Sequence, residues 1–311
     1  MSLVRTFTKD QVRLGGPAPY CTYAVVKRIH VIDEHLSLQG KRVLDLGCGI
    51  GSYTEELAQR AQWICGLDVL ESSLRAFREP IPRVQGIGEN LPFATASFDA
   101  VTMIEVLEHT VSDAQVLREC FRVLKPGGHL ILFVPNKLYP FESHPCYAGR
   151  FSLGPNIPLL SWAPDCVRKH FCPARIYTLR KLLSLARMEG FELRSKSYIF
   201  PPLDGFPLPP RLKQAYRALA MRLERTHMRI FGVSIFAAFE RPRLPKSVNG
   251  ATTKMLNGGI PNSAAGSPPP QSGITPHLFP SRVGSVLGRL WGKPAVSRYG
   301  DTLTGGNYAE L

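Results

Sequence analysis

The sequence predicts an α/β fold with a doubly wound sheet on the strength of two observations. Short apolar segments alternate with amphipathic ones between residues 42 and 134, which is the pattern of strands joined by helices. Residues 43–57, VLDLGCGIGSYTEEL, then join a strand to a helix through a glycine-rich turn. Glycine lets the backbone approach a ligand closely, and the free N–H groups of the first helical turn face the same crevice. Ser52 followed by Glu55 predicts the capping box of that helix.

Each element in turn follows from a local pattern. An imperfect apolar stripe predicts a helix over 22–36, followed by a strand at 42–46 and a helix that ends near residue 59. A second strand ends at Asp68, and a helix begins near Ser72. Five more strands are expected at 83–85, 100–106, 129–134, 191–200 and 230–240, and three more helices at 113–124, 178–188 and 211–225. Proline and two glycines at 125–128 predict a turn that ends the helix before it.

Composition predicts a folded chain in a reducing compartment. The 311 residues are 44% hydrophobic, which is enough for a core, and the longest apolar segment has ten residues, 230–239, too few to cross a bilayer. Seven cysteines without a Cys-x-x-Cys pair fit reduced thiols better than a disulfide framework. No apolar segment of a signal peptide follows Arg5, so we expect a cytoplasmic protein, with membrane association left open.

Five segments differ in pattern and charge. We expect an N-terminal helical segment at 1–40, a ligand-binding core at 41–136, a lid at 137–176, the C-terminal part of the fold at 177–243 and a disordered tail at 244–311. The lid is rich in proline and aromatic residues. Residues 137–243 carry 18 Lys and Arg against 7 Asp and Glu. This surplus favours anionic ligands, lipid headgroups or nucleic acid, or places solvated helix faces at the surface.

The glycine turn has an acid two residues before Gly-x-Gly-x-Gly, and Ser52 replaces the third glycine of the dinucleotide fingerprint. Five segments follow in order: Leu-Pro-Phe at 91–93, Ser-Phe-Asp at 97–99, Glu-Val-Leu-Glu-His at 105–109, Arg-Val-Leu-Lys-Pro-Gly-Gly at 122–128 and Val-Pro-Asn at 134–136. Together they resemble the type 11 branch of the class I S-adenosylmethionine-dependent methyltransferases, which includes quinone-biosynthesis enzymes. The resemblance covers residues 40–136 well and 137–243 in outline. It implies a Rossmann-like, seven-stranded sheet with the last strand antiparallel, and S-adenosylmethionine as cofactor.

The resemblance also implies which residues bind the cofactor. Asp68, at the end of its strand, would accept hydrogen bonds from the ribose hydroxyls. Asp45 would hold the amino end of methionine, directly or through water. The remaining contacts would come from the backbone of Gly47, Cys48, Gly49 and Gly51, with Val69 and Leu70 against adenine and Ile104 and Glu105 at the methionine part. Ile87 stands where the branch has an acid for the adenine amino group. The candidates on this side are Gly88, Glu89 and Asn90. Either Glu89 or Asn90 makes the contact with the adenine amino group, or that contact is lost.

His109 is the candidate general base, since a neutral imidazole can accept a proton from a hydroxyl or an activated carbon. The alternative is that Glu108 and His109 only orient their loop. Further candidates for substrate contact in the lid are Tyr139, Glu142, His144 and His170. The lid also holds Cys146, Cys166 and Cys172, whose types suit zinc, but none of the usual ligand spacings is present, so no metal site is expected.

These patterns predict methyl transfer to oxygen or carbon of a small, lipophilic acceptor such as a quinone- or polyketide-like ring. The apolar segment 153–162, with Arg168 and Lys169 behind it, would contact a membrane interface, wall a lipophilic pocket or pack on the domain. One alternative is an enzyme that modifies RNA with its basic half, but the aromatic residues there alternate with prolines and no RNA module is present. A second alternative is a non-catalytic partner protein that binds the cofactor. The sequence does not determine the oligomeric state.

Overall fold

The computed structural model describes residues 22–201 and 209–243. The predicted disordered tail lies outside the described residues, as do residues 1–21 of the predicted N-terminal segment. Among the described helices, none combines the length and the apolar character that a bilayer span requires.

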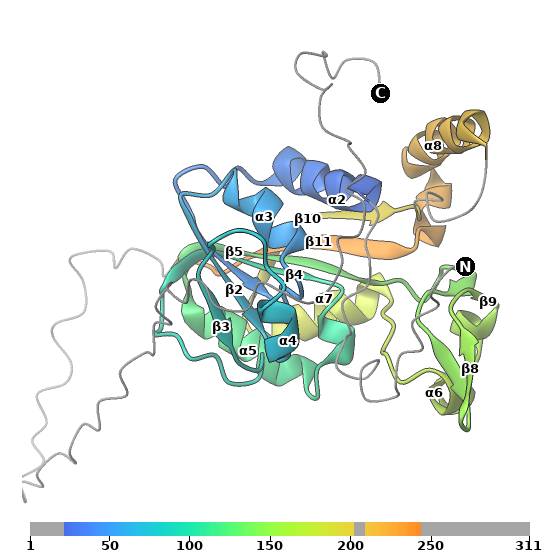
Figure 1. The fold of residues 1–311 in the computed structure, drawn as a ribbon, viewed down its shortest axis with the longest axis horizontal. Helices are drawn as coiled ribbons and strands as arrows, with labels where there is room; N and C mark the ends of the chain where they lie inside the picture. Colours follow the sequence, from blue (N-terminus) through green and yellow to red (C-terminus); the bar gives the residue numbers. More distant parts are fainter. Residues whose placement is uncertain (1–21, 202–208, 244–311) are drawn as a thin grey trace, which may run out of the picture. The chain divides into compact units, whose positions relative to one another are not determined.

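A seven-stranded sheet forms the centre of the described fold (Figure 1). Its strand order is β10-β11-β5-β4-β1-β2-β3, and β11 pairs antiparallel with both of its neighbours. This confirms the predicted Rossmann-like sheet with the last strand antiparallel. The strands are β1 Arg42–Leu46, β2 Trp63–Asp68, β3 Arg83–Gln85, β4 Phe98–Ile104, β5 Leu124–Pro135, β10 Glu192–Ile199 and β11 Ser234–Glu240.

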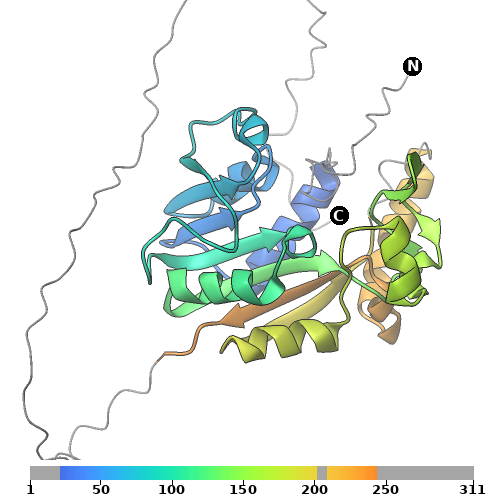
Figure 2. The ribbon, with the colours of Figure 1, turned by 90° about the horizontal axis from the view of Figure 1, so that it is seen from below.

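Helices cover both faces of the sheet (Figure 2). Side chains of a strand alternate between the two faces, so Val43 packs with α2 and α3, whereas Leu44 packs with α5 and α7. The helices are α2 Thr22–His35, α3 Ser52–Ala58, α4 Glu71–Leu74, α5 Asp113–Val123, α7 Leu179–Met188 and α8 Pro210–Glu224. The sheet is thus buried on both faces, and its ligand-binding edge is the one where the parallel strands end.

The predicted lid follows β5 and folds as two small hairpins with one helix. Strand β6 pairs with β9, and β7 pairs with β8. Cys146, Cys172 and Ala174 form a small apolar cluster inside the lid. Figures 1 and 2 both place it beyond the end of β5, at the carboxyl ends of the parallel strands. Its elements are β6 Phe141–Glu142, β7 Cys146–Ala148, β8 Phe151–Gly154, β9 Ile157–Pro158, the 3-10 helix η2 Leu160–Trp162 and α6 Asp165–Phe171.

Three predicted boundaries were wrong. Strand β4 begins at Phe98, which is buried and pairs with Leu124, and it ends at Ile104, two residues earlier than predicted. Helix α5 ends at Val123, where the Arg241 guanidinium donates hydrogen bonds to its last carbonyls, and β5 begins at Leu124 instead of residue 129. The predicted turn lies inside β5 as an irregularity, because Leu124 pairs with Phe98 and His129 with Ala100, and Gly127 between them is left-handed. Residues His227–Phe231 form the 3-10 helix η3, so β11 begins only at Ser234.

The predicted capping box at Ser52 was also wrong. The residue that precedes α3 is Gly51, with φ of +90°, and no side chain caps the helix. Ser52 is already helical, and the carboxylate of Glu55 instead accepts a hydrogen bond from the Arg78 amide. A left-handed residue is needed to enter the helix from this turn, and glycine adopts it without strain.

Candidate functional site

The turn between β1 and α3 places three left-handed glycines at the end of the sheet. Gly47 and Gly51 leave no room for a side chain, since an added Cβ would lie 2.3 Å from Val106 Cγ2 and 2.9 Å from the Phe77 ring, respectively. Gly49 differs, because a Cβ there would meet no atom within 4 Å. Its backbone is therefore open to a ligand, whereas the glycines on either side are required by packing.

Asp68 ends β2 directly across this turn. One carboxylate oxygen accepts a hydrogen bond of 2.8 Å from the Gly49 amide, and the other accepts one of 2.8 Å from the Leu70 amide. Burial raises the pKa of Asp68, and the amide hydrogen bonds oppose that effect. Asp68 thus lies beside the open backbone of Gly49, where the resemblance predicts the ribose. That contact stays a prediction.

Asp45 is buried and hydrogen-bonded inside the fold. Its two oxygens accept hydrogen bonds from the hydroxyls of Thr54, at 2.7 Å, and Thr102, at 2.8 Å. Burial raises the pKa of this carboxyl, which is only 2% exposed. Asp45 therefore joins β1, α3 and β4 from inside. The predicted contact with the amino end of methionine stays untested, and the sequence did not reveal the two threonine partners.

The predicted adenine side is built by the loop before α5. Glu89 accepts hydrogen bonds from the amides of Val111, at 2.7 Å, and Ser112, at 3.3 Å, so its carboxylate orders the chain at the start of α5. Gly88 is packed against Val116. Asn90 is exposed. Of the two candidates for the adenine amino group, Asn90 is the one that these contacts leave open to solvent. Val69 accepts a hydrogen bond from the Gln85 amide group through its carbonyl.

Glu105 follows Ile104, the last residue of β4, in a left-handed conformation with φ of +56°. Such a conformation costs a residue with a side chain about 1 to 3 kcal/mol. Its carboxylate accepts hydrogen bonds from Arg28, at 2.8 Å, and from Ser234, at 2.5 Å. Burial would raise the pKa of Glu105, but the charge of Arg28 outweighs burial and lowers it. This ion pair between α2 and the loop after β4 was not predicted.

The loop after β4 is held from the lid side as well. The Arg175 guanidinium donates hydrogen bonds to the carbonyl of Leu107, at 2.7 Å, and to the hydroxyl of Thr110, at 2.9 Å. The Arg175 amide also donates to the carbonyl of Glu108, at 3.1 Å. The loop that carries Glu108 and His109 is therefore fixed at both ends, by Arg28 at Glu105 and by Arg175 beyond it.

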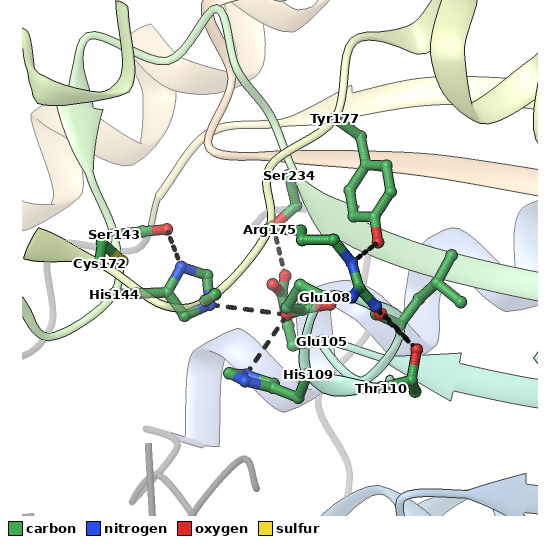
Figure 3. A network of polar contacts seen from close by, with 12 residues as sticks. Glu105, Glu108, His109, Thr110, Ser143, His144, Cys172, Arg175, Tyr177 and Ser234 are labelled. Carbon is green, nitrogen blue, oxygen red and sulfur yellow. Dashed lines mark hydrogen bonds and ion pairs between the residues drawn. The ribbon is translucent and has the colours of Figure 1, made fainter. Parts of the chain in front are cut away.

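Between these two anchors, Glu108, His109 and His144 lie together (Figure 3). Oε1 of Glu108 is 3.8 Å from Nε2 of His109 and 3.6 Å from Nε2 of His144, and the Glu108 side chain is fully buried. Neither of its carboxylate oxygens has a hydrogen-bond partner among the described residues. Burial raises the pKa of Glu108 to about 7. His144 belongs to the lid, so this acid and histidine group connects the lid to the sheet.

A second buried acid lies behind His144. Glu142 accepts a hydrogen bond of 2.7 Å from Arg168, and its other oxygen lies 3.3 Å from Nδ1 of His144. Burial lowers the pKa of an imidazole, but the carboxylates of Glu108 and Glu142 outweigh it and raise the pKa of His144 to about 10. His144 is therefore a cation at neutral pH in the absence of a ligand.

The other two lid candidates lie apart from this group. His170 is exposed on α6, and its Nδ1 lies 2.6 Å from the carbonyl of Cys166. Tyr139 packs its ring against Phe141, with centroids 5.6 Å apart. The structure thus brings His109, Glu142 and His144 together and separates Tyr139 and His170 from them.

Three side chains could hold a metal ion. The nearest ligand atoms of Glu108, His109 and His144 all lie within 4.8 Å of one another. The expectation of no metal site depended on ligand spacing within the lid. Spacing within the lid could not reveal this group, because His109 and His144 are 35 residues apart and come from two different segments. Its central residue, Glu108, is also neither a cysteine nor a histidine.

Three comparisons with known proteins bear on the family. Residues 44–132 match the family model described as "Methyltransferase domain". The chain is 36% identical over 122 residues to a ubiquinone biosynthesis O-methyltransferase of Pseudomonas fluorescens and 38% identical over 122 residues to that of Pseudomonas aeruginosa. Each match covers 35% of this chain and 51% of the relative, so the chain spans about half the length of these curated relatives.

Among solved structures, an S-adenosylmethionine dependent methyltransferase from Mesorhizobium loti is 21% identical with a TM-score of 0.47, over 68% of this chain and 96% of that one. The family model begins in β1, just before the glycine turn, and ends within β5. By the match to this family model, residues 44–132, which contain the glycine turn and Asp68, form a methyltransferase domain.

Proposed function

We propose that this chain transfers a methyl group from S-adenosylmethionine to an oxygen, or to an activated carbon, of a small, lipophilic acceptor. The observation that carries the proposal is the open backbone of Gly49 beside the Asp68 carboxylate, at the ends of β1 and β2. In an open α/β sheet, ligands bind at this position. The bound cofactor would supply the methyl group on a sulfonium, whose positive charge fades as the methyl leaves.

The chain's own residues would then position the reactants. Holding donor and acceptor in contact can contribute roughly 7 to 11 kcal/mol to lowering the barrier. Both anchors of the loop after β4 serve this purpose, because Arg28 fixes it at Glu105 and Arg175 fixes it at Leu107. We place the acceptor beside Glu108 and His109, where an imidazole and a carboxylate can receive its proton. The names of the relatives, ubiquinone biosynthesis O-methyltransferase, favour a hydroxyl oxygen on a ring as the acceptor atom.

The first prediction concerns Asp68. Asp68→Ala is expected to weaken the binding of S-adenosylmethionine by about 100-fold or more, since two hydrogen bonds to a charged acceptor contribute about 1.5 to 3 kcal/mol each. Isothermal titration calorimetry measures the affinity, and transfer of a labelled methyl group to a panel of hydroxylated aromatic acceptors measures turnover. Asp33→Ala is the matched control, since Asp33 is an exposed aspartate on α2.

Asp68→Asn keeps the shape of the side chain and separates loss of the charge from loss of folding. A wild-type chain that gives no heat with S-adenosylmethionine would contradict the proposed function. Binding without turnover on any acceptor would favour the non-catalytic alternative.

Exposed apolar residues of the lid support a lipophilic acceptor. Phe151, Leu159 and Trp162 are 63%, 57% and 49% exposed, and the basic residues Arg150 and Lys169 are exposed nearby. Exposed apolar side chains bordered by basic ones suit the surface of an anionic membrane. We expect the full chain to sediment with anionic vesicles. The double variant that combines Leu159→Ser and Trp162→Ser is expected to reduce this binding several-fold. Met188→Ser, at an exposed residue of α7, is the control. Equal sedimentation of all three proteins would contradict a role of the lid.

A further inference from the structure

We propose that Glu108, His109 and the lid residue His144 form a binding site for a zinc ion, which joins the lid to the loop after β4. One carboxylate and two imidazoles are a ligand set that zinc prefers, with a fourth position left to water or a substrate oxygen. Each of the three residues offers one atom within 4.8 Å of the other two. In a tetrahedral site with bonds near 2.0 Å, ligand atoms lie about 3.3 Å apart, so small side-chain movements complete the geometry.

The strongest observation is the state of Glu108. Its carboxylate is fully buried, it points at the two imidazoles, and neither oxygen has a hydrogen-bond partner among the described residues. A buried carboxylate without a hydrogen bond is costly, so natural proteins supply such a group with close partners or use it to hold a metal. The nearest nitrogen atoms lie at 3.6 and 3.8 Å, beyond hydrogen-bond distance. An ion between them would give the Glu108 carboxylate the partner that its oxygens lack among the described residues.

The contact between Nδ1 of His144 and Glu142 is typical of a histidine that binds a metal through its other nitrogen. A histidine that binds a metal donates its other N–H to a carboxylate, which fixes its tautomer and the orientation of its ring. Nδ1 of His144 lies 3.3 Å from Oε1 of Glu142, and Glu142 is held in turn by the buried guanidinium of Arg168, at 2.7 Å. This arrangement directs Nε2 of His144 toward Glu108. Glu105, by contrast, is paired with Arg28 and Ser234, which removes it from the ligand set.

The ion would change the role expected for His109 from base to ligand. The fourth ligand depends on the proposed function: a hydroxyl of the acceptor bound to zinc loses its proton more readily, which prepares its oxygen for methylation. The zinc site itself does not depend on methyl transfer. Its binding is measured without cofactor or acceptor, so failure of one proposal leaves the other standing.

The test is zinc binding by the full chain after metal removal with a chelator. We expect one zinc ion per chain in calorimetry and in elemental analysis. His144→Ala and Glu108→Gln are each expected to weaken binding by more than about 100-fold, and Glu142→Gln, which only orients His144, by about 10- to 100-fold. His170→Ala is the matched control, because it removes an exposed histidine from the same lid. Thermal unfolding identifies any variant that fails to fold, and His144→Gln then replaces His144→Ala.

The cysteines of the lid offer a competing site, and cobalt distinguishes the two. Cobalt bound to thiolates absorbs strongly in the near ultraviolet, whereas cobalt bound to imidazole and carboxylate does not. We expect a cobalt spectrum without the thiolate band, and its loss in His144→Ala. A thiolate band, unchanged zinc affinity in His144→Ala, or a preference for magnesium over zinc would each overturn the proposal.

Discussion

Gly47→Ala is expected to destabilise the domain by about 2 to 5 kcal/mol, and Gly49→Ala, two residues away, by only about 1 kcal/mol. Both residues are left-handed, with φ of +76° and +55°, so both variants lose the conformational freedom of glycine. Only at Gly47 does the new Cβ meet an obstacle, since it would lie 2.3 and 2.6 Å from the two Cγ atoms of Val106. Overpacking of this kind adds about 1 to 3 kcal/mol.

The effects on cofactor binding are expected in the opposite order. A methyl group on Gly49 points into the open space where we place the ligand, so Gly49→Ala weakens S-adenosylmethionine binding while the domain stays folded. Urea denaturation and calorimetry on the same preparations separate the two effects. Val106→Ala added to Gly47→Ala removes both obstructing Cγ atoms and is expected to restore most of the lost stability. Equal stability of Gly47→Ala and Gly49→Ala would contradict the packing argument.

The sequence predicted the sheet well because its signals are local. The bounds of β1 and β2 follow directly from short apolar runs that end before Gly47 and at Asp68. Buried strands have little freedom in composition, and a glycine turn interrupts them sharply. The predicted boundaries failed where a distant residue decides them: Arg241 caps α5, and pairing with Leu124 extends β4 back to Phe98.

The site could be predicted only in part, for a related reason. A glycine turn and an acid at a strand end are visible in the sequence, because backbone geometry requires them there. The direction of an acidic side chain is not visible. The hydroxyls of Thr54 and Thr102, from two other elements, donate hydrogen bonds to Asp45, and the buried Glu108 carboxylate lies beside His144 of the lid. Such contacts arise from tertiary structure and have no signature in residue spacing.

Arg168→Met is expected to cost the lid about 3 to 5 kcal/mol. Arg168 and Glu142 are 3% and 0% exposed, and their ion pair of 2.7 Å lies between α6 and β6. Removal of Arg168 leaves the buried Glu142 charge with only His144, 3.3 Å away, to compensate it. Arg194→Met is the control, because Arg194 makes an ion pair of the same length with Glu240 but is largely exposed. An exposed pair contributes about 1 kcal/mol at most.

The loss is expected to appear in the lid before the sheet. Amide hydrogen exchange of lid peptides, compared with peptides of β1 and β4, reports where the structure opens. Arg168→Met combined with Glu142→Leu removes both charges and is expected to recover much of the stability, since apolar replacement of a whole buried pair is often neutral. Exchange in the lid that is unchanged by Arg168→Met would show that the pair does not hold it.

The pH dependence of stability provides a second, independent test of this prediction. Burial would raise the pKa of Glu142, but the hydrogen bond from His144 and the charge of Arg168 outweigh it and lower the pKa below 4.5. In the wild type, the pair therefore stabilises the lid above pH 4.5, and this contribution is lost as the pH falls through the lowered pKa. In Arg168→Met, burial has less opposition and the pKa of Glu142 rises. The loss of stability in Arg168→Met, relative to the wild type, should be largest at neutral pH and smaller in acid, because protonation neutralises the Glu142 carboxylate. A loss of stability that grows in acid would contradict the stabilising role of this ion pair.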